Sequence, residues 1–220
     1  DGTIGAATFN FVAGTNTLEV HGVLAGSLTV DAAGSATTDV ITLSNTDVGA
    51  NAFAGQNIVS TDFETVNIVT AGTGAVTAQT AGTIGVGANA LNISGTNAFT
   101  AGVITASTIS ASGMTAQATG TTFVMGVAAA GVTTITGSAG NDTLLGDAAS
   151  TINGGAGNDT ITGNTGNDVL NGEAGNDTIT TNTGNDTVDG GAGNDTVVTG
   201  ANASALDVIT GGVGTDTLAI

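Results

Sequence analysis

An aspartate recurs every nine residues from Asp159 to Asp195, each time inside the triplet Gly-Asn-Asp. The chain of 220 residues contains 18 acidic side chains and no lysine or arginine, so its formal net charge is −18. No carboxylate can therefore be neutralised by a lysine or an arginine of the same chain. Carboxylates at regular, close spacing repel one another unless a dissolved cation lies between them, and hard divalent cations bind oxygen ligands of this kind. The spacing predicts an array of metal sites.

The aspartates belong to nine consecutive units that begin at Gly137. The sixth-position aspartate is present in seven of the nine units, and an aliphatic residue follows two positions later. One unit is a residue short, and another carries three extra residues. The units are 137–145, 146–153, 154–162, 163–171, 172–180, 181–189, 190–198, 199–210 and 211–219.

The composition of the units indicates how they fold. Glycine and asparagine tolerate positive φ angles, so each Gly-rich segment can turn sharply and direct several carbonyl oxygens inward. The residues after the aspartate form a short strand with one buried aliphatic side chain. Two units then make one coil, and unit n lies beneath unit n+2 at a strand spacing of about 4.8 Å. A cation between two turns would meet two carboxylates and several carbonyls, and six or more oxygens at about 2.3–2.6 Å suit Ca²⁺ better than Mg²⁺.

The chain before the repeats predicts a related fold. Short runs rich in Val, Ile and Thr, separated by Gly, Asn, Ala and Ser, indicate strands, and no stretch has a helical apolar period with caps. We therefore expect an all-β protein, a parallel β-solenoid, with a Thr/Ala/Gly-rich region at 1–136 and the repeat region at 137–220. Strands are predicted at 17–24, 27–31, 39–45, 63–70, 90–95 and 132–137.

The repeat resembles the calcium-binding nonapeptide of RTX proteins, G-G-x-G-x-D-x-U-x. This resemblance implies that the repeat region is a calcium-binding RTX β-roll with about five Ca²⁺ ions. It also implies that one unit gives each site the carbonyls of positions one and three and its aspartate. The next coil then gives the carbonyls of positions two and four and a second aspartate.

The resemblance assigns these roles to particular residues. Thr181 and Glu173 depart from the pattern at positions one and two, and Asp147 could contribute in the short unit. The implied pairs are Asp142 with Asp159, Asp159 with Asp177, Asp177 with Asp195, Asp195 with Asp216, and Asp168 with Asp186. The implied backbone ligands are Gly137, Ala139, Gly154, Gly155, Ala156, Gly157, Gly163, Thr165, Gly172, Ala174, Gly175, Asn182, Gly184, Gly190, Gly191, Ala192, Gly193, Gly212 and Gly214.

Four stretches of the first region, 39–43, 62–70, 90–102 and 108–119, resemble bacterial surface-layer (S-layer) proteins of the RTX class. This resemblance implies a secreted structural protein on the extracellular cell surface. Such a protein would self-assemble into a calcium-dependent lattice and attach through another region, for which a cell-surface glycan is a candidate partner. Two alternatives stay open: a repeat segment of a large RTX adhesin, and a calcium-dependent accessory domain of a secreted RTX enzyme.

Other features of the sequence argue against several classes of function. A chain without basic side chains is not expected to bind nucleic acid, and its longest apolar run, 123–131, is too short for membrane insertion. Neither an HExxH motif nor a GxSxG elbow is present, so we expect no enzyme activity. The single histidine, His21, is expected at the surface, and Met114 and Met125 are expected to pack.

Three acids at expected strand starts, Asp39, Asp62 and Glu64, admit two interpretations. They could bind further calcium, but acids in such places are more often solvated, and the solvated interpretation is the one we favour from the sequence.

Overall fold

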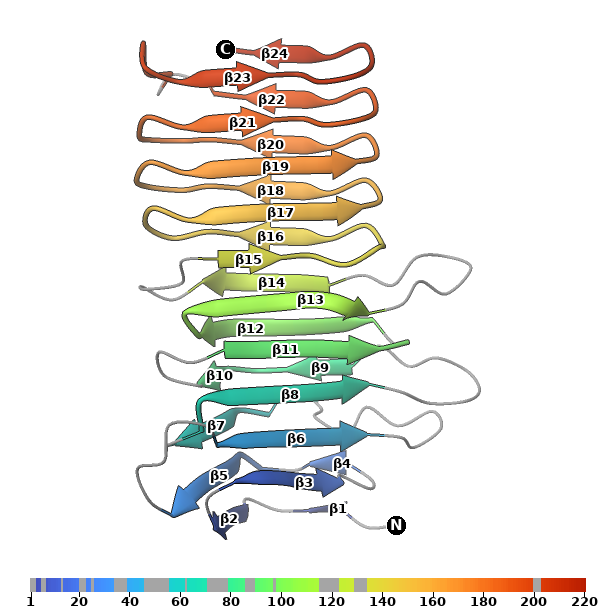
Figure 1. Ribbon diagram of the computed structural model, residues 1–220, viewed down its shortest axis with the longest axis vertical. Helices are drawn as coiled ribbons and strands as arrows, with labels where there is room; N and C mark the ends of the chain where they lie inside the picture. The colour runs from blue at the N-terminus through green and yellow to red at the C-terminus, as the bar shows by residue number, and fades with distance from the viewer. Residues whose placement is uncertain are drawn as a thin grey trace.

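Two parallel sheets run the length of the protein and face one another as a flattened coil. The computed structural model describes residues 3–4, 7–12, 14–19, 23–24, 26–33, 39–45, 56–61, 63–70, 79–85, 90–96, 98–114, 123–128, 134–199 and 203–220. Figure 1 shows the coils stacked along one axis, with the N-terminus at one end and the C-terminus at the other. Within those ranges every strand pair is parallel and there is no helix, hence none that could cross a membrane. The all-β parallel solenoid predicted from the sequence is confirmed.

The strands alternate between the two sheets along most of the chain. A short separate sheet pairs β1 (Thr3–Ile4) with β4 (Val23–Leu24). The twelve-stranded sheet contains β2 (Ala7–Val12), β5 (Leu28–Ala33), β7 (Ile58–Thr61), β9 (Gln79–Ala81), β10 (Ile84–Gly85), β12 (Phe99–Thr105), β14 (Phe123–Ala128), β16 (Thr143–Leu145), β18 (Thr160–Thr162), β20 (Thr178–Thr180), β22 (Thr196–Val198) and β24 (Thr217–Ala219). The ten-stranded sheet contains β3 (Thr15–Glu19), β6 (Val40–Asn45), β8 (Thr65–Thr70), β11 (Ala90–Gly95), β13 (Thr108–Met114), β15 (Thr134–Thr136), β17 (Thr151–Ala156), β19 (Val169–Ala174), β21 (Thr187–Asp189) and β23 (Val208–Thr210).

The register of the C-terminal strands shows that two nonapeptides make one coil. Thr160 of β18 pairs with Thr178 of β20, one coil of 18 residues later. The short unit reduces this offset by one residue, because Thr143 pairs with Thr160. The long unit increases it by three, because Thr196 pairs with Thr217. Unit n therefore lies beneath unit n+2, as predicted.

The core of the C-terminal coils is one aliphatic side chain wide. Each three-residue strand turns its central residue inward and its two neighbours outward, and the second residue of the six-residue strands β17 and β19 points inward in the same way. These inward residues are buried and stack into two facing columns, and the outer end of the stack is open, since Leu218 of the last strand is half exposed. The buried members are Ile135, Leu144, Ile152, Ile161, Leu170, Ile179, Val188 and Val197.

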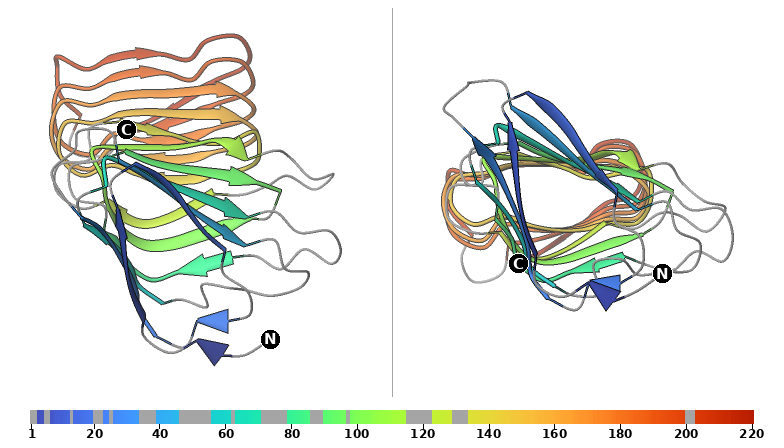
Figure 2. Two further views of the ribbon diagram at one scale, coloured as in Figure 1. Left: turned by 60° about the horizontal axis from the view of Figure 1, so that its bottom comes forward. Right: turned by 90° about the horizontal axis from the view of Figure 1, so that it is seen from below.

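The N-terminal coils have a broader core. Strands such as β8 and β11 are six residues long and bury two aliphatic residues each, and Phe63, Phe99 and Phe123 fill the wider interior. Met114 is buried among them, so its predicted packing role is confirmed. Figure 2 shows the regular oval of the C-terminal coils and the splayed strands of the N-terminal ones. Both long sheets continue through the join between the two regions, where β13 pairs with β15 and β14 with β16.

Most predicted strands are found close to their expected positions. The stretches 39–45, 63–70 and 90–95 correspond to β6, β8 and β11, and 27–31 and 132–137 overlap β5 and β15. The single strand predicted at 17–24 is wrong, because β3 and β4 lie in different sheets. Alternation of apolar residues predicted strand structure there but could not show which sheet each part joins.

Candidate metal centre

The repeated aspartates form two columns, each immediately before the strands of one long sheet. We name the column before β16, β18, β20, β22 and β24 the first ladder and the column before β19, β21 and β23 the second ladder. The strand registers place the members of each ladder in neighbouring coils. The first ladder is Asp142, Asp159, Asp177, Asp195 and Asp216, and the second is Asp168, Asp186 and Asp207.

Each ladder is joined by one kind of hydrogen bond. The backbone N–H of Asp159 donates to Oδ1 of Asp177 at 2.7 Å, and that of Asp177 donates to Oδ1 of Asp195 at 2.8 Å. The same bond links Asp142 to Asp159 at 2.8 Å and Asp195 to Asp216 at 3.0 Å. All four aspartate pairs predicted for this face are therefore neighbours in the structure.

The second ladder is longer than the sequence indicated. The N–H of Asp168 donates to Oδ1 of Asp186 at 2.9 Å, which is the predicted pair. The N–H of Asp186 then donates to Oδ1 of Asp207 at 2.9 Å, and Asp207 is not among the predicted pairs. The phrase Asp-Val-Ile-Thr at 207–210 has the same order of residue types as the end of a regular unit and was the signal available. At the other end Ser150 takes the ladder position, and its N–H donates to Oδ1 of Asp168 at 2.7 Å.

One carboxylate oxygen in each of five consecutive repeats is buried and has no hydrogen-bond donor. The Oδ2 atoms are buried and unpartnered in five aspartates whose side chains are only 1–2% exposed. A buried carboxylate oxygen without a partner is strongly unfavourable as an anion. A bound cation would fit here, because it would supply the positive partner that these buried oxygens lack. They belong to Asp159, Asp168, Asp177, Asp186 and Asp195.

Backbone carbonyls lie beside these free oxygens. A Cβ built on Gly163, at position one, would lie 2.6 Å from Oδ2 of Asp168 and 3.0 Å from the carbonyl oxygen of Thr181 in the next coil. The free carboxylate oxygen of one unit and the position-one carbonyl of the next coil thus converge on the same place. Position one is glycine in most units because a side chain would occupy that place. The arrangement gathers acceptors without donors, which is what Ca²⁺ requires.

The other predicted backbone ligands bring the turns of successive coils together. The carbonyl of Ala174, at position three, accepts a hydrogen bond from the N–H of Gly157 at 2.7 Å, and that of Gly191, at position two, accepts one from Val213 at 2.7 Å. Each of these oxygens keeps a second lone pair for a cation. The glycines at position four lie against one another in successive coils, since a Cβ on Gly175 would collide with the carbonyl oxygen of Gly157. Their role as calcium ligands stays a prediction.

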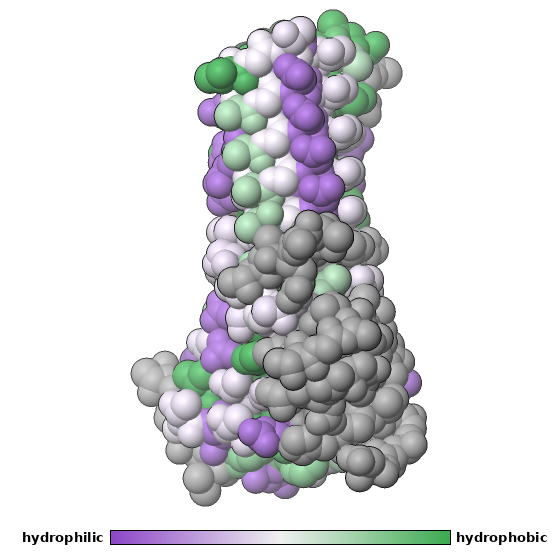
Figure 3. Space-filling view, turned by 90° about the vertical axis from the view of Figure 1, so that its right-hand side faces the viewer, coloured by the Kyte–Doolittle hydropathy of each residue, from purple (hydrophilic) through white to green (hydrophobic). Residues whose placement is uncertain are grey.

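The turns have the backbone conformation that the composition predicted. Positions two and four have positive φ in the six nine-residue units from Gly154 onward, for example 111° at Gly155 and 112° at Gly157. Non-glycine residues also occupy position two, with φ of 73° at Glu173 and 69° at Asn182. The substitution at Glu173 therefore leaves the turn intact. In Figure 3 a continuous hydrophilic column follows one side of these coils.

An asparagine column supports the first ladder from outside. The N–H of Asn176 donates to Oδ1 of Asn158 at 2.8 Å, and the N–H of Asn194 donates to Oδ1 of Asn176 at 2.6 Å. These side chains are exposed, and each occupies position five, next to an aspartate. The asparagine of the Gly-Asn-Asp triplet therefore joins neighbouring coils and leaves the aspartate oxygen free for a cation.

Burial and mutual repulsion raise the pKa values of the ladder aspartates. Burial raises the pKa of Asp159 to about 7, against the hydrogen bond from Asp142, and the charges of Asp142, Asp177 and Glu173 raise it further. Burial raises the pKa of Asp168 to about 6, against the hydrogen bond from Ser150, with a further rise from Asp186. The pKa values of three more aspartates are also raised, chiefly by burial. These are Asp142, Asp177 and Asp186. Without a cation, the fold opposes their ionisation.

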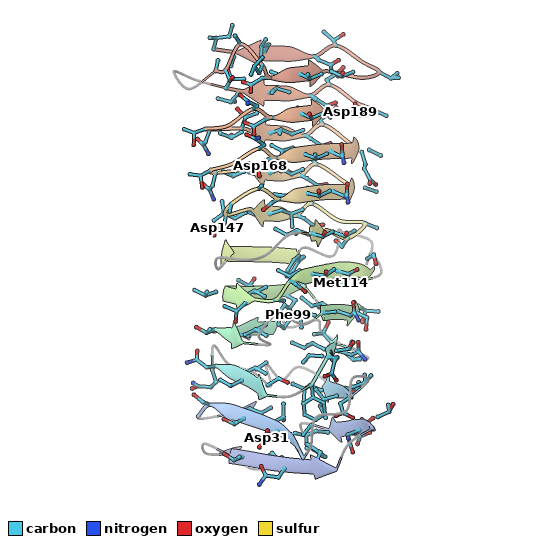
Figure 4. All side chains as sticks on the ribbon, turned by 60° about the vertical axis from the view of Figure 1, so that its left-hand side comes forward. Asp31, Phe99, Met114, Asp147, Asp168 and Asp189 are labelled. Carbon is cyan, nitrogen blue, oxygen red and sulfur yellow. The ribbon has the colours of Figure 1, made fainter. Side chains whose placement is uncertain are left out.

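The ends of the ladders differ from their middle. Both oxygens of Asp142 are occupied, Oδ1 by the N–H of Phe123 at 2.6 Å and Oδ2 by the N–H of Ser138 at 2.5 Å. Asp207 likewise uses its Oδ2 to accept a bond from Ser204. Figure 4 shows Asp147 and Asp168 on the same side of the C-terminal coils and Asp189 on the opposite side. The backbone carbonyl of Asp147 accepts a bond from Thr165 at 3.0 Å, while its own carboxylate is partly exposed.

The acids of the first region behave differently from our expectation. Asp39 is 1% exposed, so the interpretation of this residue as solvated is wrong. It precedes β6 in the stacked part of a coil, where tertiary packing covers it, and a single sequence cannot show this. Glu64 is partly buried. Asp62 and His21 lie outside the described residues, as does the side chain of Met125.

Each candidate site needs backbone as well as side-chain ligands. Among the described residues no three carboxylate or histidine side chains gather into one cluster. Two carboxylates per pair of coils therefore have to be completed by carbonyl oxygens, which the positive-φ turns supply. A parallel β-solenoid with such ladders of free carboxylate oxygens is, by its class, a cation-binding β-roll.

The family comparison agrees with this class. The family model of the RTX calcium-binding nonapeptide repeat, which spans four copies of the repeat, matches residues 128–150, 146–179 and 172–204. The coils within residues 128–204 are therefore RTX repeats, and Ca²⁺ is the ion that such repeats bind. Comparisons with curated proteins and with solved structures give no match.

Proposed function

We propose that this chain is a structural component of a secreted bacterial surface layer, in which calcium between the coils drives folding and self-assembly. The observation that carries the proposal is the row of buried, unpartnered Oδ2 atoms in a chain without lysine or arginine. Bound Ca²⁺ would supply the positive charge that these oxygens lack. Asp159, Asp177 and Asp195 on one side and Asp168 and Asp186 on the other would hold it, together with carbonyls of the turns.

Calcium concentration would then separate the unfolded and folded states. Extracellular calcium modules bind at about 10⁻⁴–10⁻³ M, far above the calcium level inside a cell. A chain with 18 acids and no basic residue stays soluble and extended before it meets the ion. The fold therefore suits a protein that is exported unfolded and becomes rigid outside.

A structural role also suits the shape. The described residues form a continuous stack of coils that two long parallel sheets hold together. We propose no catalytic role for these residues, and a cell-surface glycan would be bound by another region.

The test is a calcium titration of the chelated full chain, followed by far-UV circular dichroism and light scattering on the same sample. Growth of β-structure and of large particles over the same calcium range is the expected result. Folding to a stable monomer would favour the adhesin or the accessory module of a secreted enzyme instead. Full β-structure in chelator would contradict the role of calcium.

A matched pair of variants locates the effect. Asp177→Asn removes one ladder charge with a free Oδ2, whereas Asp189→Asn removes one charge from an exposed strand residue. We expect Asp177→Asn to raise the calcium midpoint at least tenfold and Asp189→Asn to leave it within about twofold. Equal midpoints for the two variants would refute the assignment of the ladder as the calcium site.

A further inference from the structure

The position of the second ladder recurs in the N-terminal coils. It is the residue directly before each strand of the ten-stranded sheet. The first residues of these strands pair from coil to coil between β6 and β21, although the register of β11 and β13 shifts further along, between Asn92 and Ser94. Val40 pairs with Thr65 as Val169 pairs with Thr187. Asp39 and Glu64 therefore occupy the same place in their coils as Asp168 and Asp186 do in the repeats. Figure 1 shows β6 and β8 adjacent in the broad half of the molecule.

The hydrogen bonds at this N-terminal position follow the ladder pattern. The N–H of Gly14 donates to Oδ1 of Asp39, and the N–H of Asp39 donates to Oε2 of Glu64 at 2.6 Å. The carbonyl of Asp39 accepts bonds from Glu64 at 3.0 Å and from Thr65 at 3.2 Å. Each acid thus receives the N–H of the coil before it, as in the repeats.

One oxygen of this pair is buried without a partner. Oδ2 of Asp39 has no hydrogen-bond donor, and the side chain is only 1% exposed. No lysine or arginine exists to neutralise it. The same feature marks the ladder aspartates, yet Asp39 lies far outside residues 128–204, which the repeat family matches.

The other coils do not continue this feature. At the same position Ser107 and Ser150 precede β13 and β17, so no acid occupies this position in these two intervening coils. The pair of Asp39 and Glu64 is therefore separate from the second ladder and not its extension.

We propose that Asp39 and Glu64 hold a hard divalent cation, Ca²⁺ or an ion of its class, between two coils of the N-terminal region. Two carboxylates on adjacent coils would supply the charged ligands, and Oδ2 of Asp39 would bind the ion directly. The site clamps β6 to β8 at the broad end of the solenoid. It does not depend on calcium in the repeats or on assembly into a surface layer.

The first experiment counts bound calcium on the full chain by equilibrium dialysis. We compare the unsubstituted protein, Asp39→Asn, and Glu19→Gln as a control that removes one charge from an exposed residue of β3. Asparagine keeps an oxygen to accept the bond from Gly14, so Asp39→Asn removes the charge with little change of shape. The expected result is one calcium fewer per chain for Asp39→Asn and no change for Glu19→Gln. An unchanged number for Asp39→Asn would overturn the proposal.

Hydrogen exchange with peptide resolution gives a second, local measurement. In the unsubstituted chain we expect calcium to protect residues 40–45 at least tenfold, and in Asp39→Asn we expect this protection to disappear. Asp177→Asn should weaken protection in the repeats and leave that of 40–45 unchanged, which separates this site from the repeat sites. Protection of 40–45 that is independent of calcium in the unsubstituted chain would overturn the proposal, even if Asp39→Asn failed to fold.

Discussion

The two halves of this solenoid solve the same stacking problem with different side chains. In the twelve-stranded sheet, the column that holds Asp142 and Asp159 continues into Phe123 and Phe99 in the N-terminal coils. The aromatic rings bury apolar surface, which stabilises by about 25 cal/mol per Å². The aspartates bury charge, which destabilises unless a cation binds. Coils built around rings should be stable without metal, and coils built around carboxylates should not.

The number of apolar side chains buried by each strand follows the same division. The two strands of a Gly-rich coil of 18 residues bury one aliphatic side chain each, worth about 1.5–3 kcal/mol apiece, and this cannot offset the conformational entropy of the coil. A six-residue strand such as β8 buries two such side chains, and Phe63 adds further apolar area. The N-terminal coils therefore have a hydrophobic core of their own, whereas the stability of the C-terminal coils depends on their turns.

Calcium removal should have the largest effect and should separate the two halves. In chelator we expect residues 137–220 to lose amide protection by more than about a thousandfold, because ladder repulsion then acts against a single-residue core. Residues 63–70 and 90–95 should keep most of theirs. Hydrogen exchange read by mass spectrometry measures both in one sample. Uniform loss of protection along the chain would show that the halves fold as one unit.

In the C-terminal coils, replacement of the glycine at position four should destabilise the protein more than any other single substitution. Gly175 has a φ of 137°, and a Cβ there would collide with the carbonyl of Gly157. Gly175→Ala should lower the free energy of unfolding by the backbone strain of about 1–3 kcal/mol. The methyl group should also displace the neighbouring coil and lower it further. Gly14→Ala is the control, since Gly14 has a φ of 123° and open space around its Cβ position. Thermal unfolding in saturating calcium should show the smaller loss for Gly14→Ala, and equal losses would contradict the collision.

Shortening a buried side chain should affect the narrow core moderately. Ile179→Val removes one methylene from a fully buried residue of β20 and should cost about 0.5–1.5 kcal/mol. The exposed neighbour gives the control Thr178→Val, which should stay within about 0.5 kcal/mol. Denaturant unfolding in calcium measures both. If Ile179→Val were as mild as Thr178→Val, the narrow core would contribute little to stability.

Acid should partly replace calcium, and this is the smallest effect we expect. The folded-state pKa is raised to about 7 for Asp159 and about 6 for Asp168, above the ordinary value of 3.8. The folded state therefore binds more protons, so the metal-free coils are most stable below pH 3.8 and lose that stability as pH rises through 6 to 7. Far-UV circular dichroism of the metal-free chain should show β-structure growing as pH falls across this window. Growth of β-structure with rising pH would reverse the sign and contradict the burial of these groups.

The sequence predicted the repeat region closely because its information is local. The Gly-Asn-Asp triplet fixes both turn and ligand position, and the spacing of two units per coil follows from the strand after it. Positive φ at Gly155 and Asn182 and the pairing of Asp177 with Asp195 are consequences of that regularity. Asp207 was missed where the regularity fails, because an insertion of three residues hides its position in the coil.

The first region was less predictable because its coils vary in length. Alternation predicted strands such as β6 and β8, but not that the predicted 17–24 strand divides between two sheets. Solvation of Asp39 was predicted wrongly for the same reason. Whether an acid at a strand start is covered depends on which coil lies above it, and residues 25 positions apart decide this, as the bond from Asp39 to Glu64 shows.

Two things were thus determined by the sequence alone: the parallel solenoid and the calcium chemistry of its C-terminal coils. Both follow from short-range rules, namely the φ angles that glycine and asparagine allow and the repulsion of carboxylates without basic partners. The tertiary structure alone decided how far the ladders extend, where phenylalanine replaces aspartate, and that Asp39 is buried beside Glu64. Those features depend on inter-coil register, which is set by the lengths of all the turns between two strands.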